Sequence, residues 1–330
     1  MNKHKFNFGN LTMLIFGAVL SLCPISLLHG STNKIILPAG TDQFTVALSD
    51  NNELVVQNLF VQGYIVDTDN FIKVLGKKIV NPGAYKISKN MNPIQLVKVL
   101  TGKPYMVWVL IPPGLRKEEI AILVGKKMGW TNKQKKEFIN KSTTSKIEYI
   151  EGVYMPDTYL IPVGEKPNDI ANRLISKWNE NFASHLPKFT AKNIKWTSAL
   201  TLASIVQREA ANKEDMPLIA GILWNRLNQN IALGVDATLQ YIRGDKGNGF
   251  WAPISAADKK NNSLYNTYKY KGLPPHPISN PGIDAIDAVL NPMQTNCVYY
   301  LHDKSRVTHC AATYEEHKTN IELFLKNSSN

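Results

Sequence analysis

Hydrophobic positions in residues 31–104 occur in short groups separated by Pro and Gly. Some groups recur every three or four residues, the spacing of a helix with one buried face, and others alternate with polar residues as in a strand. A continuous apolar run at 105–111 stops at Pro112-Pro113-Gly114 and predicts a buried strand. The pattern predicts helices at 53–60, 67–75, 92–100, 115–128 and 131–140, and further strands at 34–37 and 84–88.

The second half of the chain is richer in helical spacing. Amphipathic segments at 167–185, 197–211 and 215–227 predict helices, the last two joined as a hairpin. Residues 228–282 hold many Gly and Pro, and long irregular stretches inside a compact domain usually carry function. The order of elements predicts an α+β fold. The chain is expected to close with a strand hairpin at 298–301 and 307–312 and a helix at 314–325.

The N-terminus has the features of a membrane segment. Residues 11–28 carry no charge, and as a helix they are long enough to cross most of a bilayer. Lys3 and Lys5 precede them, which favours a cytoplasmic N-terminus and export of the rest of the chain. We therefore expect a cytoplasmic tail at 1–10 and a transmembrane anchor at 11–30. A cleaved signal peptide is the alternative, although no small-x-small cleavage site follows the apolar run.

Length and composition narrow the class of protein. The 330 residues suggest about two domains of roughly 150 residues each. Three Cys are too few for a disulfide scaffold or a four-Cys zinc site, and Cys297 and Cys310 could equally form a pair or remain buried thiols. The common phosphate-binding, zinc-protease and hydrolase motifs are missing, and the spacing of His302, His309 and His317 does not match a usual metal site. We therefore expect no metal and no cofactor.

The formal net charge of +12 is unevenly distributed along the chain. Residues 31–150 carry 17 basic and 9 acidic side chains, whereas residues 151–330 carry 19 and 17. A basic surface attracts nucleic acid, anionic lipid or anionic wall polymers. Because the predicted anchor exports the chain, we expect no nucleic-acid partner and favour lipid or wall polymer.

The segment 197–211 carries the clearest candidate for chemistry. Its apolar positions form one helical stripe, and Glu209 falls on the flank of this stripe. A carboxyl group held against apolar surface keeps its proton near neutral pH, as a general acid must. The alternative is an ordinary boundary glutamate paired with a cation such as Arg208. Thr197 or Ser198 is expected to cap the helix.

Three further segments mix aromatic and polar side chains, and they lie at 151–159, 248–251 and 265–268. Sugar-binding sites use this mixture, because aromatic faces stack on pyranose rings while carboxylates and amides bind hydroxyl groups. Taken singly, each segment is more simply explained as a loop packed on its own aromatic rings.

Several short motifs appear in a fixed order: Glu151-Gly-Val-Tyr-Met-Pro-Asp-Thr-Tyr159, Ala203-Ser-Ile-Val-Gln-Arg-Glu209, Asn225-Arg-Leu227, Asp236-Ala-Thr238, Tyr265-Asn-Thr-Tyr268 and the Pro-rich segment from Gly272 to Gly282. With this ordered set the chain resembles the YceG-like endolytic murein transglycosylases, a family also called MltG. The resemblance implies three parts: an N-terminal transmembrane helix, a small LysM-like α+β region at 31–150 and a helix-rich α+β catalytic domain at 151–330.

The resemblance also implies a reaction. Members of this family cleave the β-1,4 bond between N-acetylmuramic acid and N-acetylglucosamine inside peptidoglycan strands, and the muramyl C6 hydroxyl attacks C1 to leave a 1,6-anhydro end. The catalytic glutamate corresponds to Glu209, which would first protonate the glycosidic oxygen and then accept the C6 hydroxyl proton. One carboxylate suffices, unlike in ordinary glycosidases. Gln207 and His276 depart from the family pattern, which usually has Glu and Gly at these positions.

Eight further side chains are expected to bind or orient the sugar: Glu151, Asp157, Tyr159, Asp236, Gln240, Tyr265, Asn266 and Tyr268. The expected partners are peptidoglycan strands, membrane lipid through the N-terminal helix, and glycan synthases of the wall machinery. The catalytic domain is expected on the outer side of the cell membrane.

Two other functions stay open. A muramidase would hydrolyse the same bond, and a second carboxylate facing Glu209, such as Glu151 or Asp236, would favour it. A non-catalytic scaffold would hold glycan through the LysM-like region, and the departure at Gln207 favours it.

Overall fold

The computed structural model describes residues 39–140 and 151–326. The strand expected at 34–37 and the anchor expected at 11–30 lie outside these residues. In the described part of the chain no helix is long and apolar enough to cross a membrane. Helices alternate with antiparallel strands, which confirms the expected α+β class.

The helices are α1 (Asn52–Val61), α2 (Thr68–Leu75), α3 (Pro93–Leu100), α4 (Lys117–Met128), α5 (Asn132–Ile139), α6 (Pro167–Phe182), α7 (Leu186–Ala191), α8 (Trp196–Glu209), α9 (Met216–Asn228), α10 (Asp236–Arg243), α11 (Ile283–Leu290) and α12 (Tyr314–Ile321). The strands are β1 (Asp42–Val46), β2 (Gly83–Ile87), β3 (Met106–Leu110), β4 (Thr158–Pro162), β5 (Tyr299–His302) and β6 (Thr308–Ala311).

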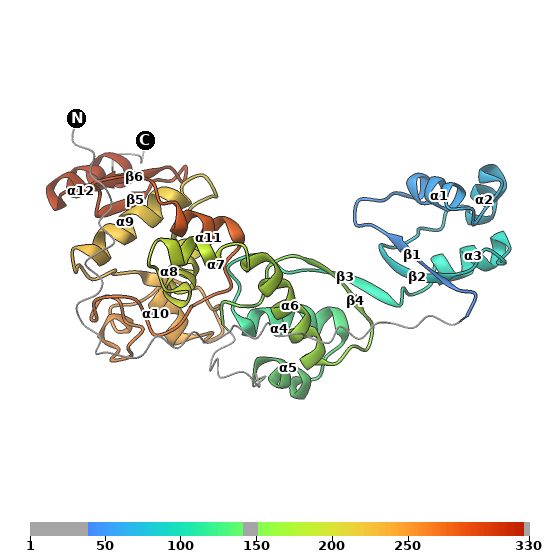
Figure 1. Ribbon diagram of the computed structural model, residues 1–330, viewed down its shortest axis with the longest axis horizontal. Coiled ribbons are helices and arrows are strands. Elements are labelled where there is room, and N and C mark those ends of the chain that lie inside the picture. The colour runs from blue at the N-terminus through green and yellow to red at the C-terminus, as the bar shows by residue number, and fades with distance from the viewer. Residues whose placement is uncertain (1–38, 141–150, 327–330) are drawn as a thin grey trace.

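The molecule is elongated, with a small N-terminal lobe (residues 42–100) and a larger C-terminal body (residues 109–326) joined through β3 and β4 (Figure 1). The lobe contains β1, β2 and α1–α3 around its own apolar core, which includes Phe44, Phe71 and Leu96. A sheet with the order β1-β2-β3-β4 runs from the lobe into the body. All three pairings in this sheet are antiparallel, and β2 meets β3 only at Ala84 and Met106.

The core of the body begins before the second half of the chain. It includes Val109 of β3 and extends through α4 and α5 to α11. The ring of Phe138 lies 5.5 Å from that of Trp130 and 5.0 Å from that of Tyr154, measured between ring centroids. The core of the lobe ends at Leu100 and the core of the body begins at Val109. This change lies ahead of the domain boundary expected between residues 150 and 151.

Helix α8 lies at the centre of the body, and all eight residues from 199 to 206 are buried. It packs against α9 and α11. The expected capping residue is wrong: the helix begins at Trp196, its N-cap Lys195 makes no side-chain capping hydrogen bond, and Thr197 and Ser198 lie inside the first turn. The Trp196 ring packs 5.7 Å from that of Trp178, and this contact favours the earlier start.

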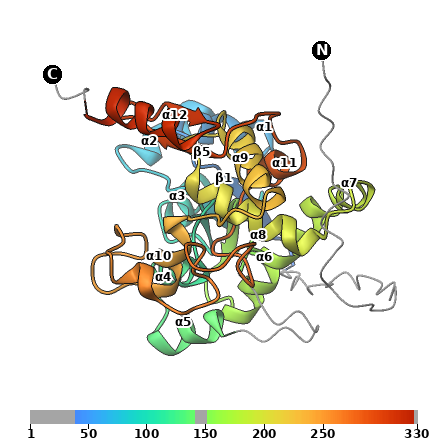
Figure 2. The ribbon, with the colours of Figure 1, turned by 90° about the vertical axis from the view of Figure 1, so that its left-hand side faces the viewer.

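Near the C-terminus, β5 and β6 pair as the expected hairpin, with Tyr300 opposite Cys310. A disulfide joins Cys297 to Cys310, which selects one of the two alternatives that the sequence left open. The helix expected at 314–325 appears as α12 followed by a π-helical turn, Glu322–Lys326. Figures 1 and 2 both show the hairpin beside α12 and close to α9.

Candidate active site

Glu209 is the last residue of α8, and its carboxylate meets a tyrosine that the sequence did not single out. The Tyr300 hydroxyl on β5 donates a hydrogen bond of 2.6 Å to Oε2 of Glu209. Burial is the largest influence on the Glu209 carboxyl and raises its pKa, although the hydrogen bond from Tyr300 acts in the opposite direction. The charge of Asp236 raises this pKa further, whereas His302 and Arg208 lower it. The net effect raises the pKa of Glu209, which is the direction that a general acid requires.

A second carboxylate belongs to the same group of side chains. Asp236 is the first residue of α10, and the hydroxyl of Tyr268 donates a hydrogen bond to its Oδ1. The pKa of Tyr268 is raised by burial, by this hydrogen bond and by the charges of Asp236 and Glu209. Two residues expected in the site, Asp236 and Tyr268, therefore lie in the electrostatic surroundings of Glu209.

Two side chains of α9, Arg226 and Asn225, hold the backbone segments that lead into β5 and α10. The Nε of Arg226 donates to the carbonyl of Val298 (2.5 Å), just before β5, and its Nη1 donates to the carbonyl of Leu233 (2.6 Å), just before α10. The side-chain nitrogen of Asn225 donates to the carbonyls of Thr295 (2.8 Å) and Cys297 (2.9 Å). The motif of residues 225–227 thus fixes the segments that carry Tyr300 and Asp236.

Glu151 occupies a different network. It is 3% exposed, and its Oε1 accepts hydrogen bonds from the Lys117 backbone (3.1 Å) and from Nδ2 of Asn280 (2.7 Å). The Oδ1 of Asn280 in turn accepts from the backbone N–H groups of Gly152 and Tyr154, each at 2.9 Å. Burial raises the pKa of Glu151 to about 8; Glu118 adds to this effect, while Arg116 and Lys117 oppose it. In this network Glu151 links three segments of the chain.

Other expected site residues hold the surrounding loops. Asn266 is fully buried, donates to the carbonyls of Lys259 and Asn261, and accepts from the backbone N–H of Tyr268. It therefore shapes the loop that presents Tyr268. The side chain of Gln240 donates to the carbonyls of Trp251 (3.0 Å) and Ala252 (3.2 Å), so it fixes the loop that follows α10.

The remaining expected residues are dispersed. Tyr159 is 7% exposed in the core, and its hydroxyl donates to the carbonyl of Met155. Asp157 is exposed beside β4 and accepts from the backbone N–H of Thr158. Tyr265 packs on Tyr241, with 5.2 Å between ring centroids. Of the expected residues, Asp236 and Tyr268 thus lie in the surroundings of Glu209. The others pack in the core or stabilise loops.

The two residues that precede Glu209 in the chain, Arg208 and Gln207, contact the turn at residues 112–114 and other segments close to it. The Arg208 guanidinium lies 3.8 Å from the centroid of the Trp251 ring, and the indole N–H of Trp251 donates to Glu119 (2.8 Å). The Oε1 of Gln207 accepts from the backbone N–H of Gly282 (3.0 Å). The amide of Gln207 therefore links α8 to the start of α11.

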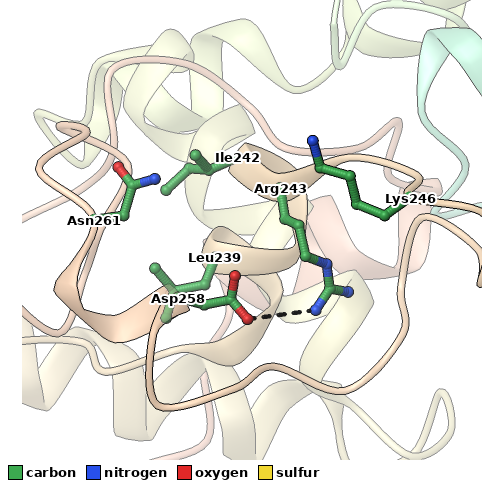
Figure 3. A pocket seen from close by; sticks show the side chains of 6 residues that line it. All are labelled: Leu239, Ile242, Arg243, Lys246, Asp258 and Asn261. Atoms are coloured by element: carbon green, nitrogen blue, oxygen red, sulfur yellow. Dashed lines mark ion pairs between the residues drawn. The ribbon is translucent and has the colours of Figure 1, made fainter.

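A cavity of about 260 Å³ lies near the other end of α10 (Figure 3). Arg243 and Asp258 form an ion pair in its wall, with 3.6 Å between Nη1 and Oδ2. Asp236 and Arg243 stand seven residues apart on α10, so the cavity is about 10 Å along the helix from the Asp236 end. Within residues 39–140 and 151–326, no group of three His, Cys, Asp or Glu side chains could hold a metal ion.

Comparisons with known proteins show the family to which the chain belongs. The endolytic murein transglycosylase of Streptococcus pneumoniae (strain D39) is 27% identical over 273 residues, which cover 72% of this chain and 50% of that protein, so the chain spans about half of that relative's length. The protein of the same name from Bacillus subtilis (strain 168) is 25% identical over 346 residues, covering 96% of this chain and 92% of its own. The crystal structure of a YceG-like protein from Listeria monocytogenes superimposes with a TM-score of 0.59 and 25% identity, covering 86% of this chain and 99% of that one. A family model described as the YceG-like family matches residues 44–323, most of the sequence, and the chain therefore belongs to the YceG-like family.

Proposed function

We propose that this protein is a membrane-anchored endolytic transglycosylase of peptidoglycan. Relatives named endolytic murein transglycosylase support this activity. As the family resemblance implies, it would cleave the β-1,4 bond between N-acetylmuramic acid and N-acetylglucosamine within glycan strands and leave 1,6-anhydro-muramyl ends. The observation that carries the proposal is the half-buried Glu209, whose pKa is raised chiefly by burial of its carboxyl and whose Oε2 is held by Tyr300.

The surroundings of Glu209 suit both halves of the reaction. In the first half, burial raises the pKa of the carboxyl and so favours the protonated form, which gives its proton to the glycosidic oxygen as the bond to C1 breaks. In the second half, the carboxylate left behind accepts the proton of the muramyl C6 hydroxyl as that oxygen bonds to C1. The hydrogen bond from Tyr300 and the charges of His302 and Arg208 stabilise this carboxylate. No second protein carboxylate is required, because the nucleophile belongs to the substrate.

Hydrolysis by a muramidase is the second candidate, and the position of Asp236 favours it. Asp236 raises the pKa of Glu209, so a second carboxylate does stand in the neighbourhood of the proposed acid. A water activated by Asp236 could replace the C6 hydroxyl as nucleophile, as in glycosidases that use two carboxyl groups. The hydroxyl of Tyr268 already occupies one oxygen of Asp236, which favours the first candidate.

The placement of the protein in the cell is also part of the proposal. Residues 11–30 would anchor it in the cell membrane, and the region 31–150 would act as a LysM-like membrane-proximal part whose excess of basic residues attracts anionic lipid or wall polymer. The body would then meet peptidoglycan strands outside the membrane, beside the glycan synthases that make them. The disulfide Cys297–Cys310 suits an oxidising compartment.

Product analysis tests the proposal. The full chain in detergent is incubated with purified peptidoglycan, and the released glycans are examined by mass spectrometry. We expect anhydro-muramyl ends, one water lighter than reducing ends, and we expect Glu209→Gln to lower the rate by at least about 100-fold because it removes the general acid. Glu214→Gln is the matched control, since Glu214 is an exposed glutamate just after α8.

Three outcomes decide between the candidates. Reducing ends in place of anhydro ends would establish the muramidase, and Asp236→Asn should then abolish them. Tight binding of glycan without any product would establish a non-catalytic scaffold. Full activity of Glu209→Gln would remove Glu209 from the reaction.

A further inference from the structure

The β5–β6 hairpin is held in place at several points that are independent of Glu209. The disulfide joins Cys297, just before β5, to Cys310 on β6. At the other end of β5, the Nε2 of His302 lies 3.1 Å from Oδ2 of Asp215, and the Thr308 hydroxyl donates to the same oxygen (2.8 Å). Asp215 is the N-cap residue of α9. The disulfide closes the hairpin, the contacts with Asp215 fix one end of β5 to α9, and Asn225 and Arg226 fix the other end through the carbonyls of Cys297 and Val298.

The strand geometry then decides which side chain reaches Glu209. Successive side chains on a strand point to opposite faces. Tyr299 packs on α12, with ring centroids 5.9 Å from Tyr314 and 5.3 Å from His317. Tyr300 consequently faces the other way, toward the end of α8, where its hydroxyl meets Oε2 of Glu209 at 2.6 Å. The hairpin thus holds the phenol group of Tyr300 against one carboxylate oxygen of Glu209.

We propose that Tyr300 is a positioning residue of the active site: by occupying Oε2 of Glu209, it leaves Oε1 as the oxygen that gives and takes the reacting proton. This inference rests on the proposed function of Glu209. It assigns to the C-terminal hairpin, which the sequence motifs do not include, a direct part in the site.

The phenol group suits this role in both states of Glu209. Burial and the charge of Glu209 hold the pKa of Tyr300 well above its usual value, so the hydroxyl keeps its proton and remains a donor. A donor at Oε2 stabilises the carboxylate formed after proton transfer and fixes the rotation of the group. The other titratable groups that act on Glu209 or Tyr300 come from each neighbouring element: Arg208 on α8, Arg226 on α9, Asp236 on α10, Tyr268 in the loop and His302 on β5.

Tyr300→Phe removes only the hydroxyl oxygen and tests the inference. Tyr299→Phe is the matched control, because it makes the same change one residue away on the opposite face of β5. With soluble glycan strands as substrate, we expect Tyr300→Phe to lower kcat by about 10- to 100-fold with little change in KM, since the carboxylate loses its orientation. The alkaline limb of kcat/KM should move to higher pH, because loss of the hydrogen bond raises the pKa of Glu209. Tyr299→Phe should behave as the wild type.

A second measurement needs no substrate and so separates this inference from the proposed function. Difference infrared titration of the full chain, each protein against its own Glu209→Gln variant, follows the protonated carboxyl band of Glu209. We expect the midpoint in Tyr300→Phe to lie above that of the wild type and of Tyr299→Phe. An unchanged midpoint, or an unchanged pH profile, would overturn the inference. If the wild type cleaves no glycan but the midpoint shifts, the proposed function fails and the link between Tyr300 and Glu209 stands.

Discussion

Replacement of Glu151 by Gln should change how the stability of the protein depends on pH. Glu151 is buried, and its pKa is raised from 4.5 to about 8, mainly by burial. The folded protein therefore binds this proton more tightly than the unfolded chain does. The stabilisation is fully present below pH 4.5, and it is lost as pH rises toward 8, because the unfolded chain can release the proton freely. Glutamine imitates the neutral carboxyl at every pH.

The magnitude follows from the two pKa values. A difference between 4.5 and about 8 is worth about 5 kcal/mol at about 1.4 kcal/mol per pH unit. Between pH 5 and pH 9 the linkage relation gives a loss of about 4 kcal/mol in the free energy of unfolding of the wild type relative to Glu151→Gln. Glu209 also has a raised pKa, but its contribution is common to both proteins and cancels in the comparison.

Urea unfolding at pH 5, 7 and 9, followed by tryptophan fluorescence, measures this difference. The amide introduced by Glu151→Gln keeps an oxygen for the Lys117 backbone and for Asn280, so the network should survive the exchange. Glu180→Gln is the control, because the side chain of Glu180 is 69% exposed, and its curve should run parallel to that of the wild type. If the free energies of Glu151→Gln and wild type differ by the same amount at pH 5 and pH 9, the carboxyl is not held neutral by burial and the reasoning is refuted.

Two further predictions concern the buried network and the hairpin. Asn280→Ala should lower the free energy of unfolding by about 3–6 kcal/mol, because it leaves two backbone N–H groups without partners in the interior and removes one of the two hydrogen bonds to Oε1 of Glu151. The exposed Asn228→Ala should change it by less than about 0.5 kcal/mol. Denaturant midpoints check both, and a loss below about 1 kcal/mol for Asn280→Ala would contradict the role of the network. Replacing both Cys297 and Cys310 by Ser should cost about 3 kcal/mol, given the 13-residue separation, and should lower activity as Tyr300→Phe does. Thermal unfolding and glycan cleavage measure the two effects. Full activity without the disulfide would show that the hairpin holds Tyr300 in place without it.

Helical periodicity predicted most of the helices, because the residues that a helix buries recur every three or four positions within one short segment. The segments expected at 92–100, 115–128 and 197–211 correspond closely to α3, α4 and α8. The short elements were harder to predict. Helix α10 lies in a stretch that the many Gly and Pro residues marked as irregular, and β4 becomes a strand through its pairing with β3, a partner about 50 residues away.

The candidate site shows the same division. Its place beside an apolar helical stripe made Glu209 a candidate, and the family resemblance assigned it the role of general acid; in the structure burial raises its pKa. Its partner Tyr300 could not be found this way, because 91 residues separate the two and only the β5–β6 hairpin brings them together. Conversely, Glu151 and Asp236 looked alike in the sequence as carboxylates in polar motifs. In the structure Asp236 lies in the surroundings of Glu209, whereas Glu151 belongs to a buried hydrogen-bond network with Asn280.

The sequence by itself determined the class of fold, most helices, the family resemblance and the identity of the candidate acid. Each of these depends on local spacing or on ordered motifs, which a single chain displays directly. The tertiary structure alone decided which carboxylate stands near Glu209, which tyrosine holds it, and that Cys297 and Cys310 are joined. These facts depend on contacts between segments far apart in the chain, and such contacts are set by the packing of α8, α9 and the C-terminal hairpin against one another.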